Sequence, residues 1–281
     1  MTLSEIKAFF KEELHKIYTD SESSELFAII CSHLFNMSKV EIRNALDNTI
    51  SEEKTEIFKR IVSELKTGKP FQQILGETEF FGLKFLVNEN VLIPRPETEE
   101  LLELAIAEIN KSNLNSFKML DIGTGSGIIP ILIKKNFGKA TVSAIDFSEE
   151  ALEIAKKNSF FHETEITFIH QDYLNENLWD VYDVIISNPP YIGIDEETEI
   201  TDSVKNFEPT MALFSPTSNA LIFYEKIAED FKNHLSENGM VFLEINQKLG
   251  EETKALFTAV LSEVHLLKDI SGNDRFIFGR K

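Results

Sequence analysis

The stretch Asp121-Ile122-Gly123-Thr124-Gly125-Ser126-Gly127 decides the fold, because it follows an apolar run and precedes a run with helical spacing. Glycines in such a turn allow a tight bend and let a ligand approach the backbone closely. A dinucleotide motif would need a glycine where Ile128 stands, and no Gly-Lys-Ser/Thr follows as a P-loop requires. The spacing, with an acid just before the glycines, therefore favours a nucleoside ligand without a diphosphate.

Strands and helices alternate around this turn from about residue 97 onward. We expect strands, separated mostly by helices, over residues 118–121, 141–146, 166–170, 183–187 and 240–245. Two extended runs, 264–268 and 275–279, close the chain and should form a hairpin. This order predicts an α/β fold with a Rossmann-like, mostly parallel sheet of seven strands, one of them antiparallel, covered by helices on both faces.

The chain before this region divides into two further parts. Apolar residues recur at helical spacing over residues 1–75, and Ser38 with Glu41 forms a capping-box pattern. This part has no catalytic constellation, so we interpret it as a helical bundle that docks the substrate. Residues 76–96 contain two short extended runs and end in prolines, which predicts a β-hairpin linker. Residues 97–281 then form the α/β domain that carries every motif of chemical interest.

Composition limits the classes of function. The 281 residues include 28 Lys and Arg against 47 Asp and Glu, a formal net charge of −19. Such a charge repels phosphate backbones and argues against direct nucleic-acid binding. Cys31 is the single cysteine, the six histidines have no metal spacing, and no run approaches the ~20 apolar residues of a membrane span. We therefore expect a cytoplasmic protein with no metal site and no membrane contact.

Acidic residues follow the next two strands and can complete a nucleoside site. Asp146 ends the second strand, where a carboxylate can accept hydrogen bonds from both ribose hydroxyls. The competing role is a helix N-cap, but Ser148 can fill that role and leave Asp146 free. Asp172 and Tyr173 follow the third strand. The acid can accept from an adenine amino group, and the aromatic ring can pack on the base.

The tetrapeptide Asn188-Pro189-Pro190-Tyr191 directly follows an apolar strand. The two prolines fix the backbone and remove two donors, so carbonyl groups are left to point into the site. The Asn188 side chain and the Pro189 carbonyl can both accept from one NH₂ group, and Tyr191 can stack on a planar group. Holding both N–H groups out of plane makes a conjugated nitrogen more nucleophilic, which is catalysis by positioning and electrostatics. The alternative is an ordinary loop turn.

These motifs resemble the class I S-adenosylmethionine methyltransferases and, within them, the HemK/PrmC family of release factor glutamine methyltransferases. The resemblance covers nearly the whole chain. The tetrapeptide is shared with DNA adenine and some RNA guanine methyltransferases, whereas the Pro-Arg-Pro-Glu-Thr-Glu segment looks like the release factor branch. The segments that carry it further are Thr78–Gly82, Ile93–Glu99, Phe207-Glu208-Pro209 with Ala212-Leu213, and Gly272-Asn273-Asp274-Arg275.

The resemblance implies S-adenosyl-L-methionine as cofactor, S-adenosyl-L-homocysteine as product and the glutamine of a Gly-Gly-Gln motif in peptide chain release factors as substrate. It places substrate binding on Asn188 to Tyr191, and we add Arg95 and Glu208. The methyl group should pass directly and in line from the sulfonium of the cofactor to the glutamine amide nitrogen. We expect the protein to be a monomer. The resemblance also implies cofactor contacts at Gly123, Thr124, Gly125, Ser126, Gly127, Asp146, Tyr173 and Asn188. The residue pattern adds Asp121 and Asp172 to this set.

Two other functions stay open from the sequence. One is an N-methyltransferase that acts on an exocyclic amino group of adenine or guanine in nucleic acid. The other is a non-catalytic, translation-associated binding protein that retains the fold. The charge of −19 counts against the first, and the uninterrupted set of site residues counts against the second.

Overall fold

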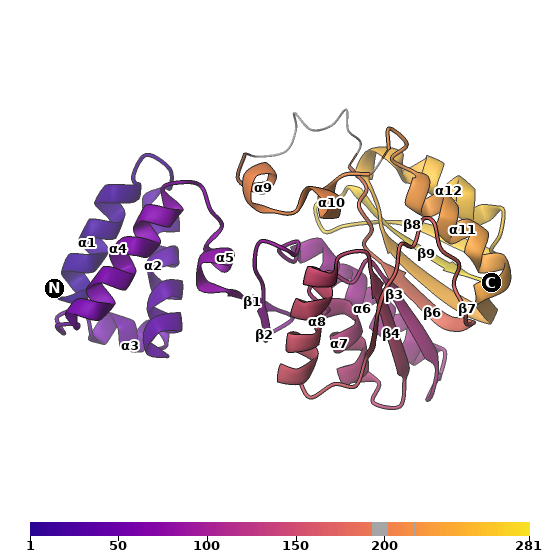
Figure 1. Ribbon diagram of the computed structural model, residues 1–281, viewed down its shortest axis with the longest axis horizontal. Coiled ribbons are helices and arrows are strands. Elements are labelled where there is room, and N and C mark those ends of the chain that lie inside the picture. Colours follow the sequence, from indigo (N-terminus) through magenta and orange to yellow (C-terminus); the bar gives the residue numbers. More distant parts are fainter. Residues whose placement is uncertain (193–201, 216) are drawn as a thin grey trace. The chain divides into compact units, whose positions relative to one another are not determined.

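A computed structural model describes residues 1–192, 202–215 and 217–281 (Figure 1). The chain divides into two compact units. The first, here the helical unit, contains Met1–Glu77 and Asp202–Phe207. The second, here the catalytic unit, contains the other described residues.

The helical unit is a bundle around one apolar core. Phe10, Phe27 and Phe58 meet in that core, and Cys31 is buried in it. Burial raises the pKa of the Cys31 thiol to about 12, so this cysteine behaves as a core residue. The helices are α1 Leu3–Leu14, α2 Asp20–Phe35, α3 Lys39–Asn44, α4 Glu52–Leu65, α5 Phe71–Leu75 and α9 Asp202–Phe207.

Side-chain caps decide where three of these helices begin. Ser38 and Glu41 form the predicted capping box at the start of α3. Equivalent boxes start α1 at Thr2 and α2 at Thr19. Each box satisfies backbone donors that the first helical turn leaves unpaired, so the polar spacing in the sequence fixes these helix boundaries.

The predicted hairpin is present as β1 Glu77–Phe80 and β2 Leu83–Leu86. Its two turn residues, Phe81 and Gly82, have φ values of 53° and 70°, as two-residue hairpin turns with left-handed backbone require. The Phe81 amide donates to Glu99 Oε1 at 2.6 Å. This bond fixes the hairpin turn to the helix that follows the linker.

The catalytic unit is built on a seven-stranded sheet, which confirms the predicted fold class. The strand order is β5-β4-β3-β6-β7-β9-β8, and β9 runs antiparallel to both of its neighbours. The first five strands in this order are parallel. The strands are β3 Lys118–Ile122, β4 Thr141–Asp146, β5 Thr167–His170, β6 Tyr182–Ser187, β7 Leu235–Glu244, β8 Glu263–Lys268 and β9 Asp274–Arg280.

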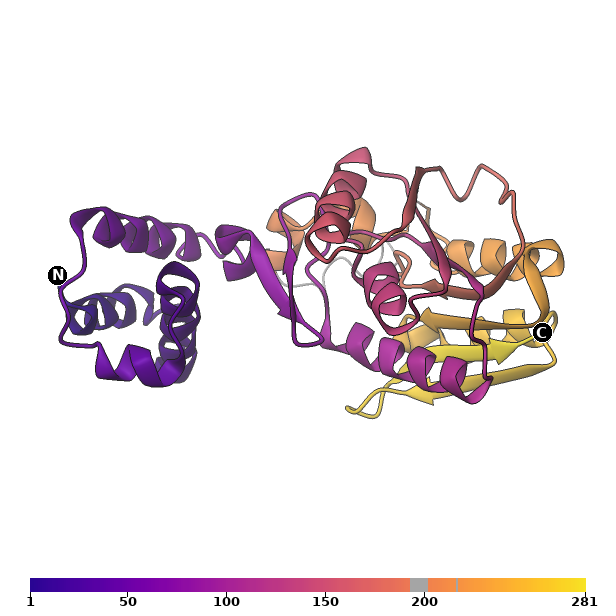
Figure 2. The ribbon, with the colours of Figure 1, turned by 90° about the horizontal axis from the view of Figure 1, so that it is seen from below.

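Successive strand residues point to opposite faces and build two cores. Met119 of β3 joins the core beneath α6 and α7, whereas its neighbour Leu120 joins the core beneath α11 and α12. Figures 1 and 2 show helices on both faces of this sheet. The helices are α6 Pro96–Lys111, α7 Ile128–Asn136, α8 Glu149–Phe161, α10 Thr210–Leu213, α11 Ile222–His234, α12 Gly250–Thr258 and the 3₁₀ helix η2 Gln247–Leu249.

Within the described residues, no helix combines the length and apolarity that crossing a membrane requires.

Candidate active site

The glycine turn lies between β3 and α7, where its backbone has a conformation that side chains disfavour. Gly123, Gly125 and Gly127 have φ values of 76°, 55° and 80°. A Cβ on Gly123 or Gly125 would meet nothing within 4 Å. A Cβ on Gly127 would lie 2.9 Å from the Cβ of Ala155 in α8. The first two glycines therefore leave room for a ligand, whereas the third permits close packing of two helices.

A cavity of about 560 Å³ opens at the carboxyl ends of β3, β4 and β6. Its size is typical of small-molecule sites, and the end of a parallel sheet is where such folds bind ligands. The structure thus brings together residues that the sequence spreads over nearly 70 positions. Predicted site residues that line it are Gly123, Gly125, Asp146, Asp172, Tyr173, Asn188 and Pro190.

Asp121 lies at the end of β3, directly before the glycine turn, and is fully buried. Neither of its carboxylate oxygens has a hydrogen-bond partner among the described residues. Burial raises the pKa of this carboxyl to about 7, and the nearby Asp146 charge adds to the shift. The Thr124 side chain lowers the same pKa. Buried polar atoms are normally satisfied, but Asp121 does not itself line the cavity, so its contact with a cationic ligand group stays a prediction.

Asp146 lines the cavity, and both of its carboxylate oxygens accept hydrogen bonds from backbone amides, whereas its contact with a ligand stays a prediction. Its Oδ2 accepts from the Gly125 amide at 2.8 Å, and its Oδ1 accepts from the Ser148 amide at 2.9 Å. Ser148 does cap α8, because its hydroxyl accepts from the Ala151 amide. Each carboxylate oxygen retains further acceptor capacity for ligand hydroxyls.

Asp172 and Tyr173 also border the cavity. Asp172 Oδ2 accepts from Asn175 Nδ2 at 2.8 Å. The Tyr173 ring is 5% exposed, and the Lys226 ammonium lies 5.3 Å from its centroid. One ring face is therefore occupied by a cation, and contact of this ring with adenine stays a prediction.

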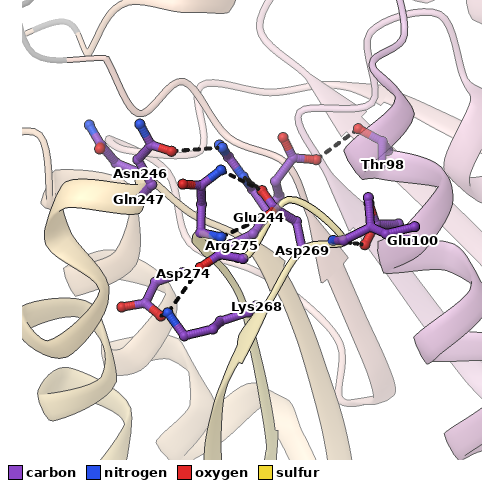
Figure 3. Close-up of polar contacts among 12 residues, drawn as sticks. Thr98, Glu100, Glu244, Asn246, Gln247, Lys268, Asp269, Asp274 and Arg275 are labelled. Carbon is purple, nitrogen blue, oxygen red and sulfur yellow. Dashed lines mark hydrogen bonds and ion pairs between the residues drawn. The ribbon is translucent and has the colours of Figure 1, made fainter.

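Asn188 begins the loop after β6 and belongs to a chain of hydrogen bonds. Its Nδ2 donates to Thr98 Oγ1 at 3.2 Å. The Thr98 hydroxyl in turn donates to Glu244 Oε2 at 2.7 Å, a contact that Figure 3 shows. The Tyr191 hydroxyl donates to Glu244 Oε1 at 3.2 Å. Glu244 is 1% exposed, and burial raises its pKa to about 7. Neither Thr98 nor Glu244 was predicted as a site residue from the sequence; for Glu244, the available signal was an acid at the end of an apolar strand.

The rest of the tetrapeptide is held by its surroundings. Pro189 is buried, and Asn246 Nδ2 donates to the Tyr191 carbonyl at 3.1 Å. Burial and the Glu244 charge raise the pKa of the Tyr191 hydroxyl above its ordinary value, so it stays protonated as a donor. Stacking of Tyr191 on a planar substrate stays a prediction.

Arg95 and Glu208 contact each other, and neither lines the cavity. Arg95 Nη2 lies 2.6 Å from Glu208 Oε1, and the Ile93 amide donates to Glu208 Oε2 at 2.9 Å. Glu208 thus fixes the segment before Pro209, which itself lines the cavity together with Thr210. A direct substrate contact of Arg95 or Glu208 stays a prediction.

A second feature that sequence reasoning missed is Asn158 of α8, which is fully buried. Its Nδ2 donates to the Ser126 carbonyl at 2.8 Å and to the Leu86 carbonyl at 3.0 Å. The Leu86 amide donates to Asn158 Oδ1 at 2.7 Å. One carboxamide therefore joins the glycine turn to strand β2 of the hairpin. In the described part of the chain, no group of three or more His, Cys, Asp or Glu could hold a metal ion.

Comparison with known proteins gives matches over both parts of the chain. Residues 5–76 match the family model of the PrmC N-terminal domain, and residues 102–206 match that of the methyltransferase small domain. The chain is 43% identical over 280 residues to the release factor glutamine methyltransferase of Flavobacterium psychrophilum, covering 99% of this chain and 98% of that one. It is 38% identical to the release factor glutamine methyltransferase of Lactococcus lactis, covering 95% and 97%.

Solved structures match the fold at low identity. A methyltransferase from Pyrococcus furiosus aligns with a TM-score of 0.51 at 20% identity, covering 72% of this chain and 90% of that one. The Thermus thermophilus 16S rRNA N2 G1207 methyltransferase, in complex with AdoMet and guanosine, aligns with a TM-score of 0.52 at 18% identity, covering 73% and 49%. At these identities the likeness supports the fold alone.

Proposed function

The chain belongs to the family of release factor glutamine methyltransferases, and from this premise we propose that it methylates the side-chain amide nitrogen of the glutamine in the Gly-Gly-Gln motif of peptide chain release factors. The observation that carries this proposal is the position of Asn188, which follows β6 and borders the same cavity as the glycine turn. An amide-binding side chain thus adjoins a nucleoside-sized site.

The enzyme is an S-adenosylmethionine-dependent methyltransferase, and its residues fit that cofactor. The cofactor supplies a methyl group on a cationic sulfonium. Asp121 would offer its unpaired, buried carboxylate to the positive charge of the ligand. Gly123 and Gly125 leave open space for the ligand beside their backbone, and Asp146 would accept from the ribose hydroxyls.

The chemistry that the chain itself contributes is the positioning of a poor nucleophile. An amide nitrogen delocalises its lone pair into the carbonyl group. Asn188 Oδ1 and the Pro189 carbonyl can accept the two N–H groups and hold them out of the amide plane. Attack on the methyl group then needs no covalent enzyme intermediate. The advantage comes from orientation and preorganised acceptors rather than from a strong base.

Protein partners are proposed to be release factors rather than nucleic acid. The net charge of −19 disfavours a phosphate backbone, and the relatives named above are named for release factors. The charge counts against adenine or guanine in nucleic acid as the substrate. The relatives, which are named methyltransferases, count against a non-catalytic role. We further propose that the enzyme is a monomer and acts in the cytoplasm, where release factors take part in translation.

The decisive experiment is transfer of a radiolabelled methyl group from S-adenosylmethionine to purified release factors, followed by mapping of the labelled residue. The expected result is one labelled glutamine in the Gly-Gly-Gln motif and no label when that glutamine is replaced. Label in nucleic acid, or none in any release factor, would contradict the proposal.

Asp146→Ala is expected to weaken S-adenosylmethionine binding. The substitution removes hydrogen bonds to a charged acceptor, worth about 1.5–3 kcal/mol each, and one such bond corresponds to roughly 10- to 100-fold in Kd. Calorimetry on the purified protein measures this change. The Asp146→Asn variant keeps one acceptor oxygen without the charge. Its cofactor Kd should lie between those of the unchanged protein and the Asp146→Ala variant. An unchanged Kd in the alanine variant would remove Asp146 from the cofactor site.

The helical unit is proposed to dock the release factor, since every chemical motif lies beyond Gly76. A chain that begins at Gly76 should bind the cofactor normally but methylate intact release factor with a kcat/KM reduced at least tenfold. The matched measurement uses a short peptide that contains Gly-Gly-Gln, which both forms should methylate equally. If both forms also treat the intact release factor equally, the helical unit has no docking role.

A further inference from the structure

Asn188 can serve the proposed reaction only if the oxygen of its carboxamide, rather than its NH₂ group, faces the substrate amide. We infer that Thr98 and Glu244 are positioning residues that fix this orientation of Asn188. The inference rests on the proposed function. It concerns residues of α6 and β7 that lie 90 and 56 positions from Asn188 along the chain.

The hydroxyl of Thr98 carries a single proton. That proton is donated to Glu244 Oε2 at 2.7 Å, so the Thr98 oxygen can only accept from its other neighbour. The neighbour is the Asn188 carboxamide, 3.2 Å away. Because the Thr98 oxygen is the acceptor, the NH₂ group of Asn188 must face it. The Oδ1 atom of Asn188 is then free to accept from a substrate.

Glu244 sets the donor-to-acceptor direction of the hydrogen bonds from Asn188 through Thr98, because an ionised carboxylate can only accept. Both of its oxygens receive donors, Oε2 from Thr98 and Oε1 from Tyr191. Its backbone carbonyl receives the Tyr224 hydroxyl at 3.0 Å. The two side-chain hydrogen bonds therefore hold the carboxylate in one orientation. The same carboxylate holds the hydroxyl of Tyr191, so one buried acid orients both ends of the tetrapeptide.

Charged groups around Glu244 come from several elements. Arg275 of β9 supplies a positive charge, and its own Nε lies 3.2 Å from Asp269 Oδ2 (Figure 3). Glu97 of α6 adds a negative charge, and Tyr191 and Tyr224 add hydroxyls. Burial dominates and raises the pKa of Glu244 to about 7. Ionised Glu244 is the acceptor described above.

Protonated Glu244 would be able to donate to Thr98 instead. The Thr98 proton could then turn toward Asn188, and the carboxamide would be stable with its NH₂ group facing the substrate. Two donors would then face each other across the site. Because ionisation is lost as pH falls through the pKa, methyl transfer at saturating cofactor should slow below about pH 7.

A simpler role is that the Thr98–Glu244 bond only attaches the first turn of α6 to the sheet. Two variants of Thr98 separate these roles. Thr98→Val keeps the shape and loses the hydroxyl, whereas Thr98→Ser keeps the hydroxyl and loses a methyl group. If the bond is only structural, the variants should lose methyl-transfer rate in proportion to their loss of thermal stability. A positioning role predicts that the rate follows the hydroxyl.

The experiment is single-turnover methyl transfer to release factor at saturating cofactor and substrate, together with the cofactor Kd and the melting temperature. The Thr98→Val variant should transfer the methyl group roughly 10- to 100-fold more slowly than the unchanged protein, because a small misplacement of a reacting group causes losses of this size. Its cofactor Kd should stay near that of the unchanged protein. Thr98→Ser should retain most of the rate. Equal rates for the two variants would overturn the inference.

Glu244→Gln provides the second readout, because glutamine cannot ionise. The unchanged protein should lose rate as pH falls from 8 to 6, and the variant should lack this acid limb. Saturating cofactor keeps titration of Asp121 out of the comparison. The same acid limb in both proteins would overturn the role of Glu244. Failure of the unchanged protein to methylate any release factor would instead refute the proposed function, and this inference with it.

Discussion

Replacement of Asn188 by alanine should slow methyl transfer by roughly 10²- to 10³-fold, the usual loss when one preorganised polar contact leaves a closed site. The Asn188 side chain is expected to hold the substrate amide in its reactive geometry. Both prolines and the glycine turn remain, so the fold and most cofactor contacts should survive. An interaction that strengthens in the transition state lowers kcat when it is removed, rather than only raising KM.

The measurement is single-turnover transfer at saturating cofactor and release factor, with the cofactor Kd determined in parallel. Asn188→Asp should also fail, because it adds a negative charge beside the reacting centre and favours the sulfonium in its ground state. It also removes the donor that Thr98 Oγ1 now accepts from. A rate for Asn188→Ala within about threefold of the unchanged protein, against the loss expected above, would make Asn188 a turn residue only.

Gly127→Ala should destabilise the catalytic unit by about 2–5 kcal/mol. Part of this comes from φ of 80°, which side chains disfavour, and part from a Cβ only 2.9 Å from the Ala155 Cβ. The Ala155 Cα lies 3.1 Å from the same position, so no flexible side chain can move away. For a domain of this size the melting temperature should fall by roughly 5–15 °C.

Two other glycines make matched controls for this prediction. Gly138→Ala meets nothing within 4 Å and has no positive φ, so its melting temperature should hardly change. Gly123→Ala has a φ of 76° with open space around the new Cβ, and should show the backbone cost alone. Thermal unfolding of all three variants without cofactor measures the difference. A Gly127→Ala protein as stable as Gly138→Ala would show that α7 and α8 do not need their close approach.

Local patterns predicted the features whose causes are local. The alternation of apolar strands and helical spacing gave the sheet of the catalytic unit, since strand burial leaves a continuous apolar run. Ser38 and Glu41 are three residues apart, so their capping box was legible in the sequence. The glycine turn was also legible, because its backbone conformation excludes most other residues.

The contacts that sequence reasoning missed join residues far apart in the chain. Thr98 meets Glu244 across 146 positions, and the Ile93 amide meets Glu208 across 115. No periodicity reports such pairs, because they depend on which elements the fold places together. The bond from the Gly125 amide to Asp146 likewise spans 21 positions and joins two strand connections.

The shared carboxamide of Asn158 makes the hairpin and the cofactor turn energetically coupled. Leu86 and the Ser126 carbonyl both depend on this one side chain, so displacement of either changes the hydrogen bonds of the other. Such coupling acts in both directions: a ligand that orders the turn is expected to order Leu86 as well, and a change that displaces Leu86 is expected to disturb the turn. Strand β2 supplies no cavity-lining residue, yet its backbone is joined to the cofactor turn through this one side chain.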